Sequence, residues 1–462
     1  MSNTVIIKFC EEYDRAKISA ILSQGMNELH YTPRGNVFVK PNVVFAYHSE
    51  TFGGHAFTAP PFVGASLTTL ANAPGVTRVD MGENSAVGLP TRLNYKHAGY
   101  FTEVKEVRSR VSCPVGIFCM DEVLRDSVFV GGAVHDNLRI SRRMARADSK
   151  VYLPKLKGHC VSNMTGAVKL NIGICSDDER AIRHDFMLNE KIVDLLAPGY
   201  PDFIAMDAID VGVGNEAFPT PRKMGLILMG DNPLAVDLVG ARLLGYDIED
   251  VAYLKLAVER GYTPASLDEV DLRGDITTLS ALDEHAQRIH PYDDEFHRWQ
   301  DVNKELDRLK SPIRFYFGPY RHEPGKKCLT GCVMGVKMFL GSIEKFAGSE
   351  AFASANPVVM IVGRIDETID AKGADVFLVG SCAKADIVNA RKIKHFDKCF
   401  TTASDLNLGM AHKLGMPVVT TTPSAILPMV GYMAAASFMK LIKGRYFQDM
   451  GHFLTTHLNK RV

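Results

Sequence analysis

The residues best suited to chemistry lie in one stretch, 151–175, with the sequence VYLPKLKGHCVSNMTGAVKLNIGIC. It holds Lys155, Lys157, His159 and Lys169 and no acidic residue. Lysine ammonium groups, hydroxyls and amides beside a glycine turn can bind a carboxylate or a phosphate. The stretch therefore predicts a site for a small anion, in which His159 serves as acid or base because free histidine titrates near neutrality. The alternative, a solvated basic loop, stays open.

Acidic residues form a second group, and each has a structural alternative. Asp207 and Asp210 follow an apolar stretch, where they are suited to hold a hard cation or to act as a base. Asp237 lies between apolar neighbours in a predicted helix and needs a partner, for which the lysines above are candidates. Asp231 is expected to be only a helix cap.

The third group consists of cysteines in the C-terminal part of the chain. Cys328 and Cys332 are four residues apart, and Cys382 and Cys399 follow. Four thiolates can hold a [4Fe–4S] cluster or a zinc ion. No ferredoxin-type run is present, and Gly335 stands where a third closely spaced cysteine would be expected. The cluster is therefore a hypothesis, and four unrelated buried thiols are its alternative.

Composition limits the classes of function. Lysine plus arginine and aspartate plus glutamate both number 53, so the net charge is zero, which disfavours a general nucleic-acid binder. Nine cysteines, an odd number, argue against a disulfide framework and for reduced thiols. The N-terminus lacks signal-peptide features, and prolines interrupt the apolar run 416–439, which predicts a buried strand, a turn and a helix rather than a membrane span. We expect a soluble cytoplasmic protein with no membrane partner.

The elements that must position these groups are predicted as short apolar strands separated by helices. This pattern is typical of an α/β fold with a mostly parallel sheet covered on both faces. Three parts are expected, namely an α/β domain over 1–281, a charged helical linker over 282–311, and a smaller α/β unit over 312–462 that carries the cysteines. No internal repeat is evident. The predicted strands are 37–39, 76–79, 150–154, 202–206, 225–229, 358–362, 376–379 and 416–420, and the predicted helices include 233–244 and 404–414.

Three segments between residues 36 and 262 together resemble the domain-of-unknown-function family numbered 362. They are Val39-Lys40-Pro41-Asn42, then LPKLKGH with TGAVK at 153–169, and then a third segment that runs from Asp207 through Gly212-Val213-Gly214-Asn215 to Asp237. Many relatives in that family carry ferredoxin-type iron–sulfur motifs, and the resemblance therefore implies redox work. This chain departs from the pattern, because it has only the four looser cysteines and has Glu216-Ala217 where Gly-Pro is common.

A fainter similarity links His159, Gly166 and Lys169 to the lactate racemase family with its nickel pincer nucleotide. Together these observations predict an iron–sulfur protein, an oxidoreductase acting on a small anionic substrate. The alternative is a cluster-free isomerase or lyase that uses a divalent cation, and a non-catalytic ligand-binding protein is a third option. An electron-transfer partner and a homo-oligomer are compatible with the first hypothesis.

The candidate residues are grouped by role. The predicted catalytic residues are His159, Lys169 and Lys157. The predicted substrate-binding residues are Lys40, Asn42, Lys155, Thr165, Asn171 and Asn215. The predicted metal ligands are Cys328, Cys332, Cys382 and Cys399 for the cluster and Asp207 and Asp210 for a divalent cation.

Overall fold

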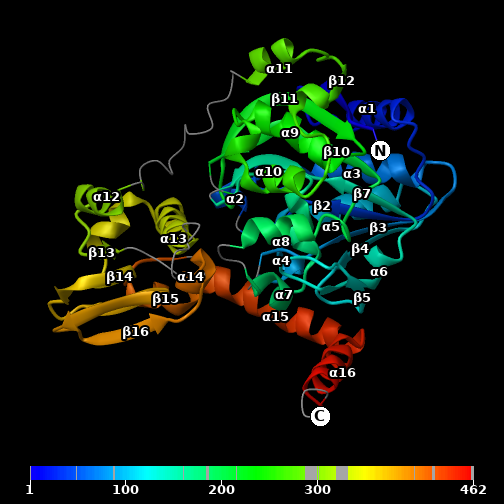
Figure 1. The fold of residues 1–462 in the computed structure, drawn as a ribbon. Helices are drawn as coiled ribbons and strands as arrows, with labels where there is room; N and C mark the ends of the chain where they lie inside the picture. The colour runs from blue at the N-terminus through cyan, green and yellow to red at the C-terminus, as the bar shows by residue number, and fades with distance from the viewer. Residues whose placement is uncertain are drawn as a thin grey trace. The chain divides into compact units, whose positions relative to one another are not determined.

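The chain folds into two compact units, which are described separately (Figure 1). The computed structural model describes residues 2–47, 49–86, 89–159, 161–183, 187–214, 216–286, 299, 301–318, 331–399, 401–418 and 422–458. The first unit comprises 1–182, 189–291 and 429–462, and the second comprises 183–188 and 292–428. The sequence-based division placed 312–462 in one C-terminal unit, whereas the contacts of 429–462 group them with the first unit.

The first unit is built on a ten-stranded sheet that is mostly parallel in its centre, and it confirms the predicted fold class. Its main strand order is β12-β1-β11-β10-β7-β2-β3-β4, and β8 and β9 extend from β10. The strands are β1 (Thr4–Phe9), β2 (Gly35–Pro41), β3 (Val76–Glu83), β4 (Val115–Cys119), β7 (Ser149–Leu153), β8 (Lys155–His159), β9 (Asn163–Thr165), β10 (Phe203–Val213), β11 (Thr220–Gly230) and β12 (Asp271–Gly274). Strands β5 (Arg125–Phe129) and β6 (Asn137–Ser141) form a separate hairpin.

Helices cover this sheet because every second strand residue is apolar and must be buried. The side chains of Val39, Met81 and Ala205 share one core with α1 (Arg15–Glu28) and α3 (Pro60–Ala71). The remaining helices of this unit are α2 (Ser49–Phe52), α4 (Thr91–His97), α5 (Tyr100–Arg108), α6 (Arg142–Ala145), α7 (Asp177–Ala181), α8 (Leu188–Asp194), α9 (Pro233–Leu243), α10 (Ala252–Glu259), α11 (Leu279–Ala286) and the 3-10 helix η1 (Lys169–Ile174). The predicted helix 233–244 corresponds to α9, which Asn232 caps by accepting from the amides of Leu234 and Ala235.

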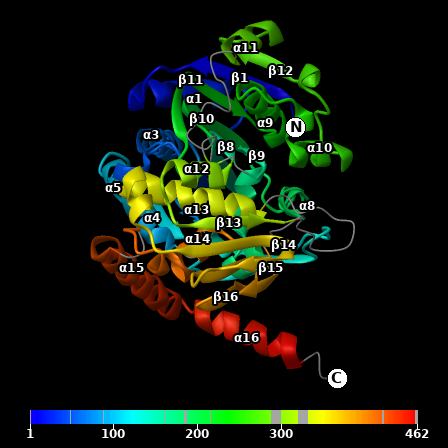
Figure 2. The same cartoon turned by 90° about the vertical axis from the view of Figure 1, so that its left-hand side faces the viewer.

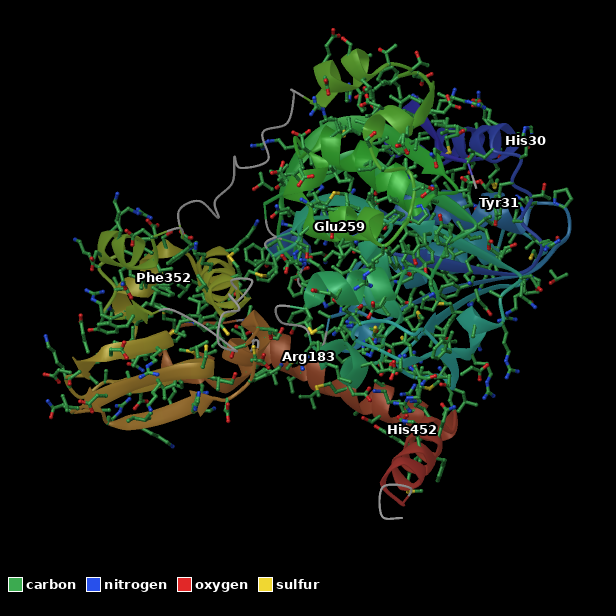
Figure 3. All side chains as sticks on the ribbon, in the orientation of Figure 1. His30, Tyr31, Arg183, Glu259, Phe352 and His452 are labelled. Atoms are coloured by element: carbon green, nitrogen blue, oxygen red, sulfur yellow. The ribbon has the colours of Figure 1, made fainter. Side chains whose placement is uncertain are left out.

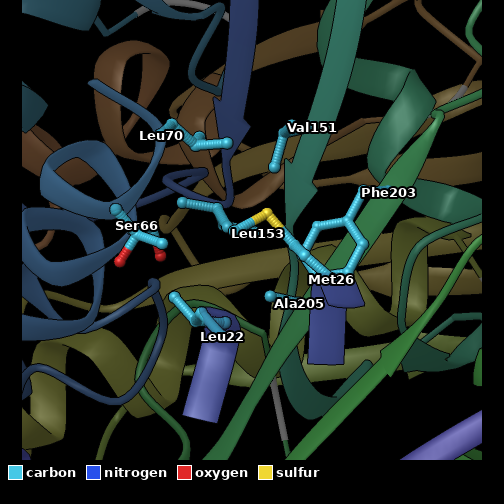
Figure 4. Close-up of a pocket in the computed structure, with 9 residues that line it drawn as sticks. Leu22, Met26, Ser66, Leu70, Val151, Leu153, Phe203 and Ala205 are labelled. Carbon is cyan, nitrogen blue, oxygen red and sulfur yellow. The ribbon is translucent and has the colours of Figure 1, made fainter. Parts of the chain in front are cut away.

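A small cavity in this core is apolar (Figure 4). Leu22 and Met26 of α1, Ser66 of α3 and Phe203 of β10 are among its lining residues. The Ser66 hydroxyl donates its proton to the Phe62 carbonyl at 2.8 Å. Tyr31, labelled in Figure 3, stacks on Phe203 at 5.1 Å between ring centroids and closes the core beside it. The cavity is a packing void and not a binding site.

The second unit contains a parallel sheet whose strands fold back on themselves. Strand β14 (Val358–Asp370) pairs in parallel with β15 (Asp375–Val388), although only four residues link them. A straight strand of 13 residues spans about 43 Å, whereas that link reaches about 18 Å, so each long strand must consist of two arms. The arms meet at Gly363 and Gly380, whose φ angles of 81° and 100° suit glycine.

The register of this sheet reveals a repeat along the chain. Val359 pairs with Val376, and Val376 pairs with Ile393 of β16 (Lys392–Phe396), so each strand-to-strand step has the same length in sequence. Figure 2 shows β14, β15 and β16 side by side. The expectation of no internal repeat was wrong. The repeat is hard to recognise in the sequence, because only two short segments resemble each other closely, VVMIVG at 358–363 and DVFLVG at 375–380.

Helices pack on the part of this sheet that the first arms of β14 and β15 form, beside the edge strand β13 (Arg314–Phe317). They are α12 (Val302–Arg308), α13 (Gly331–Ala347) and α14 (Ala403–Gly409), and Trp299 packs on Phe352 (Figure 3) at 5.4 Å between ring centroids. The predicted helix 404–414 is α14 followed by a 3-10 turn. The predicted strand at 416–420 was wrong for 416–418, which form no strand, and 419–420 lie outside the described residues.

The chain closes with α15 (Pro423–Ile442) and α16 (Arg445–Leu458). Among the described residues, α15 is a helix long and apolar enough to cross a membrane, yet only 17% of its most apolar window is buried. The helix predicted within the run 416–439 is confirmed by α15.

Candidate functional site

Two buried lysine–carboxylate pairs lie at the carboxyl ends of the central strands, where open α/β sheets bind ligands. In the first pair, Lys40 Nζ contacts Glu83 Oε2 at 2.5 Å, and the side chains are 0% and 2% exposed. A Cβ on Gly173 would collide with both groups, so η1 lies directly over the pair. Burial lowers the pKa of Lys40 and raises that of Glu83, and their contact opposes both shifts.

The second pair joins Lys155 to Asp207. Lys155 Nζ donates to Asp207 Oδ2 at 2.9 Å and to the Tyr13 hydroxyl at 2.9 Å. Tyr13 in turn donates to Asp207 Oδ1 at 3.0 Å, and the amide of Ala59 donates to Oδ2 at 3.0 Å. Burial, followed by the charge of Asp207, raises the pKa of Tyr13 far above its usual value. Both oxygens of Asp207 are thus engaged by protein donors.

These pairs argue against the predicted cation site at Asp207 and against direct anion binding by Lys40 and Lys155. A cation at Asp207 would have to displace Lys155, and Asp210 instead faces Lys223 at 3.4 Å. No cluster of three or more histidine, cysteine, aspartate or glutamate side chains suited to a metal occurs among the described residues. The stretch 151–175 contains no acid, yet a carboxylate from another strand balances the charge of Lys155, as Glu83 does for Lys40.

The other basic residues of the predicted site gather around the β8–β9 hairpin. Lys157 Nζ is fully buried and donates to the carbonyls of Ala56 at 2.6 Å and Glu216 at 2.7 Å. His159 Nε2 lies 3.7 Å from Glu216 Oε1. The positive charges of Lys169 and Lys157 both act on His159. Glu216, an acid that the sequence analysis had not assigned to the site, therefore contacts both Lys157 and His159.

His159 differs from the prediction in its protonation. Its Nδ1 accepts from the amides of Val161 at 3.1 Å and Ser162 at 3.2 Å, which assigns the proton of the neutral ring to Nε2. Burial lowers its pKa to about 3, Glu216 opposes the shift, and Lys169 and Lys157 add to it. The expected titration near neutrality was wrong. At pH 7 the ring is neutral and presents an Nε2–H donor.

Several buried polar atoms of the predicted binding residues have no protein partner among the described residues. They are both amide atoms of Asn42, the hydroxyl of Thr165 and the amide nitrogen of Asn171. The Asn171 oxygen accepts from the Tyr152 hydroxyl at 2.7 Å, so only the amide nitrogen of this side chain lacks a partner. Buried polar atoms are usually satisfied, so such atoms indicate a place for a ligand or for water. Asn215 lies outside the described residues.

Asp237 has a different partner from the lysines proposed for it. Its carboxylate accepts from the amides of Ala167 at 2.6 Å and Val168 at 2.9 Å, just before η1 begins. Gly166 must be glycine here, because a Cβ would overlap the carboxylate. Burial raises the pKa of Asp237 to about 7, and the two amide bonds oppose this shift. Asp237 therefore anchors the segment that carries Lys169.

In the second unit, two of the four predicted cysteine ligands, Cys332 and Cys382, lie close together at one end of the coils, and no third described cysteine completes a metal-binding group with them. Cys399 follows Cys382 at the same spacing at which Ile393 follows its strand partner Val376, which is one step of the register. A Cβ on Gly380 would lie 3.0 Å from Cys332 Sγ and 3.9 Å from Cys382 Sγ, so both sulfurs flank this glycine. The amide of Thr401, two residues after Cys399, donates to Cys332 Sγ at 3.3 Å. Cys328 lies outside the described residues.

The fold explains why these cysteines meet. Val362 pairs with Val379, but Arg364 pairs with Lys384, so the second coil carries three extra residues at its turn. Cys382 lies in this enlarged turn. Helix α13 places Cys332 beside it, because Gly335 lets the helix backbone approach Thr401, where any side chain would collide with the carbonyl. No disulfide joins the described cysteines.

Comparison with known proteins supports the family resemblance. The model of the family described as Domain of unknown function (DUF362) matches residues 37–242. The resemblance is confirmed over this segment. It contains both lysine–carboxylate pairs and the β8–β9 hairpin, and it ends before the segment 292–428 that makes up most of the second unit. A thylakoid-associated protein of Synechocystis sp. is 25% identical over 243 residues, which cover 51% of this chain and 71% of that protein.

A solved structure is also similar to this chain. It is the lactate racemase apoprotein from Thermoanaerobacterium thermosaccharolyticum, with 10% identity and a TM-score of 0.35, over 77% of this chain and 68% of that chain. The enzyme family is the one whose faint similarity the sequence suggested. A TM-score at this level carries no argument about the site.

Proposed function

We propose that this protein is an iron–sulfur oxidoreductase. In this proposal Cys328, Cys332, Cys382 and Cys399 hold a [4Fe–4S] cluster in the second unit, and the DUF362 segment binds a small anionic substrate. The observation that carries the proposal is the convergence of Cys332 and Cys382 on Gly380, with Cys399 one register step from Cys382.

The described residues supply two neighbouring thiols for such a group, Cys332 and Cys382, but no group of three or more metal-binding side chains. Thiolates are the ligands of [4Fe–4S] clusters, and N–H donors to the ligating sulfurs tune them, as the Thr401 amide would for Cys332. Cys332 also lies in the first turn of the long helix α13, whose N-terminus favours negative charge. A bound cluster would supply one-electron transfer.

In the first unit, the protein's own groups would orient the substrate. The neutral His159 would donate from Nε2–H to an oxygen of the anion, and Lys169 would supply positive charge beside it. The partnerless atoms of Thr165 and Asn171 are suited to further hydrogen bonds. Lys40 and Lys155 would keep the strand ends in place through their carboxylates rather than bind the anion directly.

Anaerobic purification tests the cluster. We expect a brown protein with about four iron and four sulfide per chain and an electron paramagnetic resonance signal after reduction, as a [4Fe–4S] centre requires. Cys382→Ser should lose most of the iron. Cys113→Ser in the first unit is the matched control and should retain it. A colourless, iron-free parent protein, or equal iron in both variants, would overturn the proposal.

The alternative of a cluster-free isomerase or lyase makes a different prediction from the same experiment. It requires magnesium, manganese or nickel in place of iron, with Cys382→Ser fully active. The engagement of both Asp207 oxygens by Tyr13, Lys155 and a backbone amide argues against its cation site. The third option, a non-catalytic ligand-binding protein, requires full function after His159→Ala. A cytoplasmic location is part of the proposal, since the cysteines must stay reduced.

A further inference from the structure

Arg125, at the start of β5, is a buried cation of the first unit that the proposed function does not use. Its side chain is 0% exposed. The guanidinium group donates to three backbone carbonyls, those of Arg139 at 2.7 Å, Ile174 at 3.2 Å and Met120 at 3.3 Å. Burial lowers the pKa of Arg125 to about 10, so the group still carries its charge at neutral pH.

The surroundings of this charge are unusual for a residue that only fills space. Glu179 Oε2 lies 3.9 Å from Arg125 Nη1, which is beyond hydrogen-bond distance, and Arg125 Nε has no partner among the described residues. Carbonyl dipoles therefore supply most of the compensation. Removing an ion from water is costly, and an apolar side chain could fill the same volume at lower cost. The buried charge thus indicates a task other than packing.

The contacts of Arg125 show that it fixes one end of the 3-10 helix η1. Ile174, whose carbonyl accepts from Arg125, is the last residue of η1, and the same helix carries Lys169 and Asn171. The next carbonyl along the chain accepts from Asn84 Nδ2 at 2.8 Å. Carbonyls at the end of a helix lack partners within the helix, and a cation stabilises them. The end of η1 is therefore held by two side chains from outside the helix.

We propose that Arg125 is a positioning residue, which holds η1 so that Lys169 and Asn171 keep their places around a bound anion, and this role rests on the anion site of the proposed function. Between these residues and Ile174 lies Gly173, where a Cβ would collide with the Lys40–Glu83 pair. The helix end therefore has little room to adjust, and a change at the Ile174 carbonyl should displace η1.

Helix α16 in turn holds the backbone of Arg125. Gln448 donates to the Arg125 carbonyl at 2.6 Å and accepts from its amide at 2.9 Å. In the neighbouring strand β6, Arg139 Nη1 donates to Asp449 Oδ1 at 2.9 Å. The C-terminal helix thereby sets the position from which the guanidinium group reaches η1. Gln448 is half-buried, so its replacement changes the support of Arg125 without opening a gap in the core.

Hydrogen exchange and anion titration of the full-length protein test this role. Arg125→Lys keeps the charge but loses the planar fork, so the amides of 169–174 should exchange about ten-fold faster, as one lost hydrogen bond to a charged group requires. Inorganic phosphate, titrated by calorimetry, should bind about ten-fold more weakly. Gln448→Leu should shift both quantities in the same direction by a smaller factor. Arg146→Lys is the matched control, since Arg146 is 66% exposed and contacts Asp126 of β5, and it should match the parent.

Three outcomes would overturn the role of Arg125. The first is exchange of η1 in Arg125→Lys at the rate of the parent. The second is exchange in β2 and β10 that quickens by the same factor as in η1, since this would mean a general loosening of the fold. The third is unchanged phosphate affinity beside faster exchange of η1. A parent protein that binds no phosphate counts against the anion site of the proposed function, and hydrogen exchange alone then decides whether Arg125 holds η1.

Discussion

The two units gather their reactive side chains by different means. In the first unit, parallel strands bring groups together from 43 residues apart for Lys40 and Glu83 and from 52 residues apart for Lys155 and Asp207. In the second unit, the repeating coil places Cys399 one step from Cys382, and α13 adds Cys332. The first arrangement neutralises its charges internally, whereas the second brings two like side chains, Cys332 and Cys382, to one turn.

The difference teaches what each arrangement is for. A buried lysine with a buried carboxylate partner is satisfied, and it holds two strand ends together. No disulfide joins the described cysteines. The proposed function assigns a shared ligand to Cys332 and Cys382. The predictions below test this contrast between structural pairs and a ligand-binding turn.

The largest effect is expected for Lys155→Met. This change leaves Asp207 buried without its cation and should lower the free energy of unfolding by about 3–5 kcal/mol. Urea denaturation followed by circular dichroism measures it. The control is Lys255→Met, since Lys255 pairs with Glu249 at the surface and its loss should leave the midpoint unchanged. A variant as stable as the parent would show that Lys155 is available to bind anions.

A smaller effect is expected for Gly335→Ala in α13. The new methyl group would press against the Thr401 carbonyl, move the helix and cost about 1–3 kcal/mol. Iron content should fall as well, because the Thr401 amide contacts Cys332. Gly431→Ala is the control, since that glycine lies in α15 with open space around it. Full iron occupancy in Gly335→Ala would show that iron binding does not depend on the position of α13.

The smallest expected effect is on the pH dependence of stability, through His159 in the β8–β9 hairpin. The pKa of His159 falls from 6.5 in the unfolded chain to about 3 in the folded one, so the unfolded state takes up its proton first. Stability should be complete above pH 6.5 and decline toward pH 3, by about 1.4 kcal/mol at pH 5.5. Thermal unfolding of His159→Gln should lack this part of the decline.

The parent must be compared with His159→Gln, because Asp237 changes the stability with pH in the opposite direction. Its pKa is raised to about 7, so its contribution is present at low pH and is lost as the pH rises through 7. The difference between the parent and His159→Gln isolates the histidine. His30→Asn changes an exposed histidine and should follow the parent curve. Identical curves for the parent and His159→Gln would contradict the neutral His159.

Much of the architecture followed from the sequence. The apolar runs at 37–39, 76–79 and 225–229 lie inside β2, β3 and β11, the run at 150–154 matches β7 except for its last residue, and the helix predicted at 233–244 is α9. These segments are recognisable because the need to bury apolar residues and to cap a helix is local. The repeat of the second unit was missed because its turns differ in length and its third coil, KIKHF, is polar.

For the candidate site, the sequence by itself determined the residue types: an acid-free stretch with Lys157, His159 and Lys169, and cysteines late in the chain. Only the tertiary structure decided their partners. Glu83 and Asp207 come from distant strands, amides from the turn after β8 set the proton of His159, and an enlarged turn brings Cys382 to Cys332. Charge state depends on burial and on contacts across many residues, which a linear pattern does not encode.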